Sequence, residues 1–360
     1  MTTRQAPPVQ QPTRRPGTTR GAFTLLCAGM VMSNLDLTVA NIGLPAMQHD
    51  LAGSTLGQLS WVLDGYAIVF AALLVPAGRW ADRVGLRRAF LIGAALFAGA
   101  SAACALAPDV WLLVGGRLLQ AAGAAVMLPA SLALLLATSP ADRRPSVVRM
   151  WAAVSTTAAA LGPVLGGLLV TASWRWLFLV NLPVGVVTVA LGGRLLPAHR
   201  PERKTSVPDV AGSLMAALGI GALALTLVKG ADWGWSSWRT LAAAACGALL
   251  LTVTAWRIAR HPRPLIEPAL LRIRTFTASG AAALLYGATF GAFLLSFTLW
   301  CQSQLGWSAI RTGLALTPGT ACTPFVTLAS AALARRYRPT AVITVGSLAL
   351  AAGVLWWTLA

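Results

Sequence analysis

The chain has 360 residues, of which 57% are hydrophobic and only 11% are charged, whereas soluble globular domains carry roughly 25% charged residues. Its formal net charge is +18, but the arginines fall in short clusters between long apolar runs. A nucleic-acid-binding protein would need a soluble basic module, which the sequence lacks. Composition therefore excludes an ordinary soluble domain and a nucleic-acid partner, and it predicts an all-α polytopic membrane protein.

The N-terminal residues 1–20 are rich in Pro, Gln, Thr and Arg, and we expect them to form a disordered cytoplasmic tail. The apolar run that follows is too long for the core of a signal peptide, so it is interpreted as a retained first span. Runs of apolar residues predict about eleven transmembrane helices. They cover residues 22–45, 59–78, 89–107, 111–137, 147–172, 176–195, 210–228, 239–257, 276–300, 312–334 and 340–360.

Basic residues set the predicted orientation. If the N-terminus is cytoplasmic, nearly all of the 28 Lys and Arg residues lie in cytoplasmic segments, as the positive-inside rule requires. The exceptions are Arg175, Lys229, Arg239 and Arg311 outside and Arg117 within a span. The only long polar stretch between spans includes residues 199–208, which we interpret as a cytoplasmic linker after a first block of six spans.

Nothing in the sequence predicts an enzyme, a metal or a cofactor. The five cysteines lie far apart in or beside apolar runs and are interpreted as core-filling thiols. The three histidines fall in separate predicted loops, and no loop gathers His, Asp or Ser in a catalytic spacing. We therefore expect no metal ion and no cofactor.

Three motifs carry the functional prediction. After the second span comes GRWADRVGLRR, in which we expect the two glycines to allow close helix approach and Asp82 to accept hydrogen bonds from the arginines or to cap the next helix. The fourth span carries GGRLLQAAGAAVMLP, where Arg117 and Gln120 share one helix face with Gly123 beneath them. The fifth carries ALGPVLGGLL, which predicts a bent, tightly packed helix. A packing interface of small residues would also account for this stretch without any function.

These stretches resemble motifs of the major facilitator superfamily. The first is similar to its loop signature G-x-L-A-D-R-x-G-R-K/R, although Trp80 and Leu86 depart from that pattern. The second is similar to its proton-transfer motif, with Ala121 in place of a glycine. The third resembles the antiporter motif G-P-x-x-G-G. The resemblance implies a gating loop and an antiporter helix, which here comprise Gly78, Asp82, Arg83, Gly85, Arg87 and Arg88, and Gly162, Pro163, Gly166 and Gly167, respectively.

The order of further segments, beginning with LDLTVANIGLP, resembles the fourteen-span drug:proton antiporter branch of that family. The branch implies two six-helix bundles separated by two extra spans. We therefore expect a first bundle over 21–198, the extra helices over 209–258 and a partial second bundle over 259–360. Because the chain ends during the eleventh span, we expect either a fragment of a longer transporter or a truncated product.

Three charged residues lie within predicted spans at similar depths. With a rise of about 1.5 Å per residue, Asp36, Asp64 and Arg117 lie roughly 7–9 Å from the outer surface. Charges at one depth that face one bundle interior are expected to pair, and two acids with one arginine would leave a net negative proton site. The family resemblance assigns proton coupling to Asp36, with Arg117 as its modulator and Asp64 as a second acid. A permanent Asp36–Arg117 ion pair and a merely interfacial Asp64 are the structural alternatives.

The predicted function is proton-coupled efflux of amphipathic or cationic drugs across the cytoplasmic membrane by alternating access. The cargo charge is expected because acids and Trp residues would line an apolar cavity. Asn41, Trp61, Tyr66 and Gln120 are the expected cavity residues. A small-metabolite symporter and a non-transporting membrane remnant or scaffold are the alternatives.

Overall fold

A computed structural model describes residues 20–51, 53–197, 209–261, 268–337 and 339–359, and this part of the chain is helical without strands. The predicted tail, apart from Arg20, and the predicted linker 199–208 lie outside the described residues. The helices are α1 (Arg20–Asp50), α2 (Leu56–Val84), α3 (Leu86–Ala105), α4 (Val110–Thr138), α5 (Arg144–Ala172), α6 (Trp176–Leu179), α7 (Asn181–Leu195), α8 (Val210–Trp233), α9 (Trp238–Arg260), α10 (Pro268–Leu271), α11 (Arg274–Ser303), α12 (Ala309–Arg336) and α13 (Pro339–Leu359).

The helices occupy the positions at which the apolar runs predict spans, and the short α6 and α7 together cover 176–195. Within the described ranges, eight helices are long and apolar enough to cross a membrane, or up to nine if the bent α5 is one span. This is fewer than the eleven spans predicted, and α11 and α12 are not among them. The predicted class, an all-α bundle of membrane helices, is confirmed.

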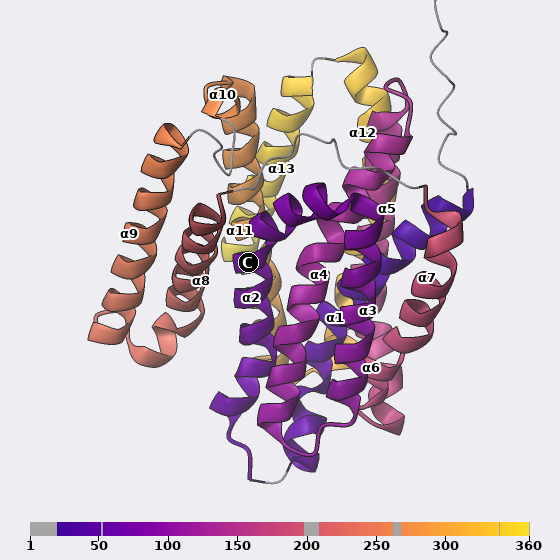
Figure 1. The fold of residues 1–360 in the computed structure, drawn as a ribbon. Coiled ribbons are helices and arrows are strands. Elements are labelled where there is room, and N and C mark those ends of the chain that lie inside the picture. The colour runs from indigo at the N-terminus through magenta and orange to yellow at the C-terminus, as the bar shows by residue number, and fades with distance from the viewer. Residues whose placement is uncertain (1–19, 52, 198–208, 262–267, 338, 360) are drawn as a thin grey trace, which may run out of the picture.

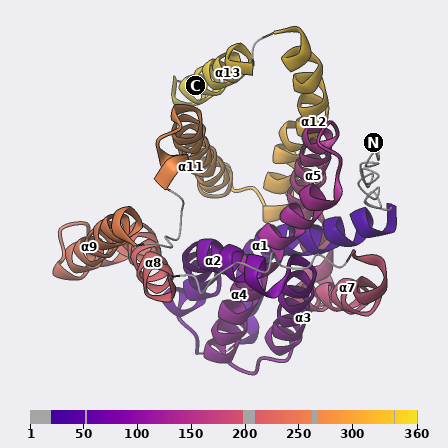
Figure 2. The ribbon, with the colours of Figure 1, turned by 45° about the horizontal axis from the view of Figure 1, so that its top comes forward.

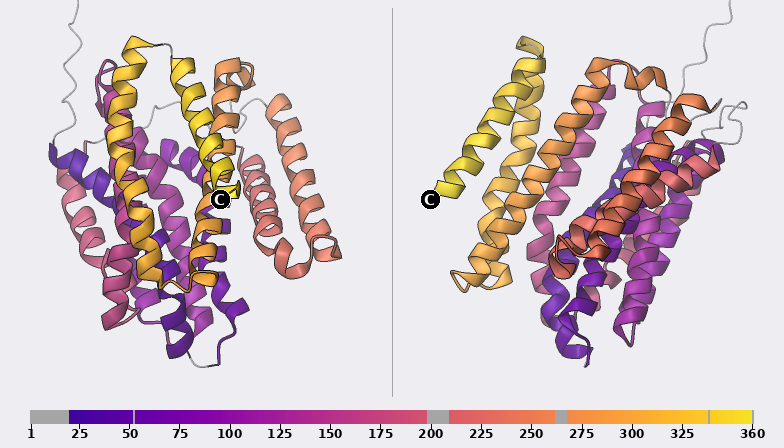
Figure 3. Two further views of the ribbon diagram at one scale, coloured as in Figure 1. Left: turned by 180° about the vertical axis from the view of Figure 1, so that it is seen from behind. Right: turned by 90° about the vertical axis from the view of Figure 1, so that its left-hand side faces the viewer.

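Helices α1 to α7 form one bundle (Figure 1), in which α4 packs against α2 and α3 while α1 packs against α5 and α7. Helices α8 and α9 form a hairpin beside α2 (Figure 2). Helices α11 to α13 stand on another side of the bundle (Figure 3), where α12 packs along α5.

Two apolar clusters fill the bundle. Phe90, Phe97 and Met127 belong to the first cluster together with Tyr66, and Leu113 and Phe178 belong to the second together with Val62. Between α3 and α4, a Cβ atom added to Gly93 would lie 2.8 Å from the carbonyl oxygen of Gly123. The absence of side chains at these two glycines lets the helix backbones approach closely, as in many membrane helix pairs.

Side-chain caps define where the spans begin on one side of the bundle. At α2, the amide of Gln58 donates to Thr55 Oγ1 at 3.2 Å while Gln58 Oε1 accepts from the Thr55 amide at 2.9 Å, which is a capping box. At α4, Asp109 Oδ1 accepts from the amides of Trp111 and Leu112 at 2.8 and 2.9 Å. These caps satisfy helix-end N–H groups that would otherwise face the membrane boundary.

Candidate functional site

The centre of the bundle contains a buried ion pair between Asp36 of α1 and Arg117 of α4, whose side chains are each 1% exposed. The Asp36 carboxylate accepts two further hydrogen bonds through Oδ1, from Gln120 Nε2 and Asn181 Nδ2, each at 3.0 Å. Charged groups inside a membrane bundle are costly unless they are paired and hydrogen-bonded. Here α1, α4 and α7 supply that pairing, so the site has no net charge.

Arg117 is held on several sides at the junction of the two apolar clusters. Its Nε donates to the carbonyl oxygen of Val62 at 3.0 Å, and a terminal nitrogen donates to Gln120 Oε1 at 2.9 Å. Its guanidinium carbon lies 4.3 Å from the ring centroid of Tyr66, a cation–π distance. The Val62 carbonyl group and the Tyr66 ring, both on α2, therefore orient Arg117 toward α1.

Two residues of this site were not singled out by the sequence. Ser101 Oγ on α3 accepts from Gln120 Nε2 at 2.7 Å and from Asn181 Nδ2 at 3.4 Å, which links both amides. Asn181 begins α7 and is 2% exposed. A signal for Asn181 was present, because a polar amide in the run SWRWLFLVNLPVG needs a partner. Ser101 gives no comparable signal in its small-residue helix.

Asp64 does not join the ion pair, contrary to the expectation from its depth. It lies on α2 with its carboxylate 2.9 Å from Lys229 Nζ of α8. Lys229 Nζ also donates to Ser60 Oγ at 2.7 Å and lies 5.1 Å from the ring centroid of Trp61. Asp64 lies two residues from Val62 and from Tyr66, and two residues along an α-helix rotate the side-chain direction by about 200°. The Asp64 side chain therefore leaves α2 on a different face.

The residues facing Arg117, Val62 and Tyr66, are one helical turn apart, and Ser60 and Asp64 form the corresponding pair on another face of α2. Matched depth therefore does not place two charges in one site. Lys229, which the sequence interpretation placed in an outer segment, is a buried residue of the α8 span with a second carboxylate, that of Asp232, at 3.1 Å.

The four residues expected in the substrate cavity lie in different environments. Tyr66 and Gln120 are fully buried beside Arg117. Trp61 is half-buried beneath Lys229, and Asn41 is exposed and donates to the carbonyl oxygen of Leu37 in its own helix at 3.0 Å. The structure therefore does not gather these four side chains around one hollow.

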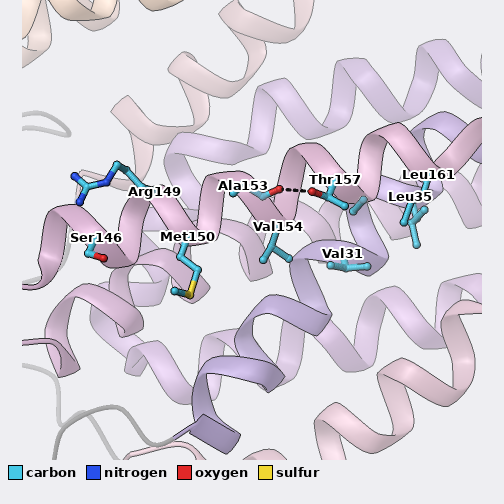
Figure 4. A pocket seen from close by; sticks show the side chains of 10 residues that line it. Val31, Leu35, Ser146, Arg149, Met150, Ala153, Val154, Thr157 and Leu161 are labelled. Carbon is cyan, nitrogen blue, oxygen red and sulfur yellow. Dashed lines mark hydrogen bonds between the residues drawn. The ribbon is translucent and has the colours of Figure 1, made fainter. Parts of the chain in front are cut away.

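A pocket of about 610 Å³ lies elsewhere, between α1 and α5 (Figure 4). Its walls include Val31 and Leu35 of α1 and Met150, Val154 and Leu161 of α5. This volume falls in the range of small-molecule sites, roughly 300–1,000 Å³. Leu35 directly precedes Asp36, so α1 presents one side to the pocket and another to the buried ion pair.

The predicted gating loop joins α2 to α3 with almost no intervening chain. Gly85 has φ +97°, a value that L side chains rarely adopt, and it is also the N-cap of α3, so Asp82 does not cap that helix. Arg87 donates from one terminal nitrogen to the carbonyl oxygens of Gly193 and Leu196, each at 3.4 Å, which ties the loop to the end of α7.

The remaining gating residues lie at the surface of the bundle. Asp82, Arg83 and Arg88 are exposed. Gly78 borders a second hollow of about 370 Å³, and a Cβ atom added there would meet no described atom within 4 Å. The expectation of close helix approach at Gly78 is therefore wrong for the described residues.

The predicted antiporter helix, α5, bends by 43° between 144–159 and 164–172. A Cβ atom added to Gly162 would clash with Thr38 Oγ1 and lie 2.7 Å from Thr38 Cβ, and one added to Gly166 would lie 3.3 Å from Val39 Cα. The bend and the close packing are both confirmed. At these glycines α5 packs against the segment of α1 that carries Asp36. Gly167 is buried, whereas the side chain of Pro163 lies outside the described residues.

At the end of α1, Asp50 Oδ2 accepts hydrogen bonds from Trp174 Nε1 at 2.8 Å and from an Arg175 terminal nitrogen at 2.5 Å. The Arg175 guanidinium lowers the pKa of Asp50 below its ordinary value. These bonds fasten α1 to the turn between α5 and α6. Among the described residues, no group of three or more His, Cys, Asp or Glu side chains could hold a metal ion.

Residues 26–360 match the profile of the Major Facilitator Superfamily. The chain belongs to this family. It is therefore a multi-pass membrane protein of a transporter family.

Several relatives are named for antibiotic resistance. The chain is 35% identical over 326 residues to a methylenomycin A resistance protein of Streptomyces coelicolor, covering 89% of this chain and 68% of that one. It is 33% identical to a tetracenomycin C resistance and export protein of Streptomyces glaucescens, covering 92% and 61% of the two chains. A puromycin resistance protein of Streptomyces alboniger is 35% identical, covering 92% and 66%. The chain thus spans about two thirds of the length of these relatives.

Among solved structures, the fold resembles that of a peptide transporter, with a TM-score of 0.57 and 16% sequence identity. The match covers 89% of this chain and 70% of the other. At this identity the likeness shows the fold alone.

Proposed function

We propose that this chain acts in proton-coupled efflux of small amphipathic molecules across the cytoplasmic membrane. The buried Asp36–Arg117 pair is the observation that carries the proposal. A carboxylate inside a membrane bundle is costly, and in transporters such groups commonly relay protons. The relatives named for resistance and export support an outward direction of transport.

Asp36 has two chemically distinct states in this site. Ionised, it binds Arg117 and accepts bonds from the Gln120 and Asn181 amides. Protonated, it no longer neutralises Arg117, so the contact that fastens α1 to α4 weakens. Gly162 of α5 contacts the same stretch of α1, so a shift of α1 would change the shape of the pocket between the two helices. In this proposal, protonation of Asp36 switches the α1–α4 contact between two states, as alternating access requires.

The orientation and the division into domains belong to the same proposal. The distribution of Arg and Lys supports a cytoplasmic N-terminus. We assign residues 21–198 to a first six-helix bundle, 209–258 to two extra helices and 259–360 to part of a second bundle. The packing of α8 against α9, and of α4 against α2 and α3, supports the extra hairpin and the first bundle as units.

Transport in everted membrane vesicles tests the function. Vesicles energised to an inside-acid gradient should accumulate at least one of three fluorescent amphipaths, anionic, neutral or cationic, and nigericin should abolish the uptake. Asp36→Asn should remove gradient-driven uptake, while Asp142→Asn, at an exposed acid on the inner end of the bundle, should leave it unchanged. Full uptake by the Asp36→Asn protein would refute the proposal.

A second role fits the same contacts. Because Asp36 accepts hydrogen bonds from Arg117, Gln120 and Asn181, the pair has the complete partnership expected of a permanent structural ion pair. In that case Asp36→Asn would lower stability without uncoupling transport from the proton gradient.

A further inference from the structure

The pocket between α1 and α5 is apolar along most of its length. Val31, Leu35, Val154 and Leu161 line it, and Met150 adds a flexible, polarisable side chain. Lining residues run from Ser146 to Leu161, about 22 Å along α5 at the rise of an α-helix. The walls therefore suit an elongated molecule with a mainly apolar body.

One charge, that of Arg149, lies at one end of this pocket (Figure 4). Arg149 is partly buried and forms no ion pair with any residue that the structure describes. Ser146 lies at the same end, whereas the Thr157 hydroxyl already donates to the carbonyl oxygen of Ala153 at 2.8 Å. The guanidinium is thus the strongest hydrogen-bond donor available to an occupant.

No Asp or Glu is among the residues that line this pocket. The sequences of α5 and of residues 274–359 contain no Asp or Glu, and α12 of that region packs along α5. On α1 the acid next to the pocket, Asp36, is turned to Arg117 and neutralised there. Just before α5, Asp142 is accompanied by Arg143 and Arg144, so that segment also carries net positive charge.

We propose that this pocket binds an elongated amphipathic organic anion, with its anionic group on Arg149 and its apolar body directed toward Leu35 and Leu161. This inference rests on the proposed transport function, and it replaces the cationic cargo expected from the sequence. That expectation needed an acid-lined cavity, and none of the lining residues is an acid. Arginine binds carboxylates and sulfonates through paired, charge-assisted hydrogen bonds, which gives it this specificity.

Equilibrium binding to the purified full-length chain in phosphatidylcholine nanodiscs tests the ligand class. Three probes share one apolar body: pyrenebutyrate, pyrenebutanol and pyrenebutyl-trimethylammonium. Energy transfer from tryptophan to pyrene reports occupancy, and empty nanodiscs give the contribution of lipid partitioning. We expect saturable binding of pyrenebutyrate that is at least about tenfold tighter than that of the other two, since a hydrogen bond between two charged groups is stronger than one between neutral groups.

Variants of the basic end assign the effect to one residue. Arg149→Gln should weaken pyrenebutyrate binding by about tenfold or more and leave pyrenebutanol binding unchanged. Arg149→Lys, which keeps the charge but loses the paired donors, should fall between the native protein and Arg149→Gln. Arg143→Gln, which removes an exposed arginine that does not line the pocket, should have no effect. Val154→Trp, which fills the apolar part, should abolish saturable binding of all three probes.

Three results would overturn the proposal: equal or tighter binding of the cationic probe, unchanged pyrenebutyrate affinity in a folded Arg149→Gln protein, or complete displacement of pyrenebutyrate by phosphatidylglycerol added to the nanodiscs. The last would identify the occupant as a membrane lipid. Binding needs no proton gradient, so failure here is separate from failure of efflux. Gradient-driven uptake of the cationic amphipath alone would contradict the ligand class and leave the transport function intact.

Discussion

Replacing Arg117 by methionine removes the charge that neutralises Asp36 while keeping a side chain of similar length in the same apolar space. The Asp36 carboxylate would then remain buried with only its two amide donors, Gln120 and Asn181. Breaking one side of a buried ion pair typically costs about 3–5 kcal/mol. Because the amides still bind Asp36, we expect the loss in the free energy of unfolding to fall near the lower end of that range.

Reversible unfolding of the purified chain by dodecyl sulfate, followed by tryptophan fluorescence, measures this loss. Combining Arg117→Met with Asp36→Asn removes both charges, and the double variant should recover at least about 2 kcal/mol relative to the sum of the single changes. Arg175→Met serves as the matched control, since its ion pair with Asp50 is exposed and its loss should cost much less than that of the buried pair. Additive single changes, or a cost of Arg117→Met equal to that of the control, would refute this account of the buried pair.

Three further predictions concern packing and charge elsewhere. Gly162→Ala should destabilise the bundle by about 1–3 kcal/mol because its Cβ atom has no room against α1, whereas Gly99→Ala, whose Cβ atom meets nothing within 4 Å, should be neutral or slightly stabilising in the same unfolding assay. Lys229→Met should loosen α8 from α2, measured as faster proteolysis of that hairpin, and adding Asp64→Asn should restore protection by removing the unpaired acid. The Arg257 side chain and an α8 amide lower the pKa of Asp209. The Asp209 carboxylate therefore stabilises the fold above about pH 4, and this contribution is lost as the pH falls through the lower folded-state pKa. Asp209→Asn should flatten the acid side of the plot of stability against pH, and an unchanged plot would contradict this.

The sequence predicted the helices well because a span needs only a run of apolar residues of sufficient length. The same one-dimensional reasoning placed Asp36 and Arg117 at one depth, and the structure pairs them. It failed for Asp64, because depth along a helix does not give azimuth, and the side chain of Asp64 leaves α2 on the face toward α8. Periodicity within α2 could have separated Asp64 from Tyr66, but choosing which face meets α4 requires the packed bundle.

Polar partners of the site were predictable only in part. Gln120 lies one turn from Arg117 in the same helix, so its place beside the pair follows from spacing. Asn181 and Ser101 reach the site from α7 and α3, and their contact depends on a tertiary arrangement that no local pattern encodes. The sequence led us to expect an acid-lined cavity, whereas none of the residues that line the pocket between α1 and α5 is an acid, and Asp36 is paired with Arg117.

Proton movement driven by a substrate gradient tests the central claim most directly. The full-length chain is reconstituted into liposomes that contain a trapped red pH-sensitive dye, with no imposed pH gradient and with potassium and valinomycin clamping the voltage. An outward gradient of pyrenesulfonate or of pyrenyl-trimethylammonium, whose fixed charges carry no protons, is then applied. The account predicts that efflux of one of these probes drives protons in the opposite direction, and that Asp36→Asn abolishes this proton movement. Probe efflux at the normal rate with no proton movement, or proton movement that persists in the Asp36→Asn protein, would contradict it.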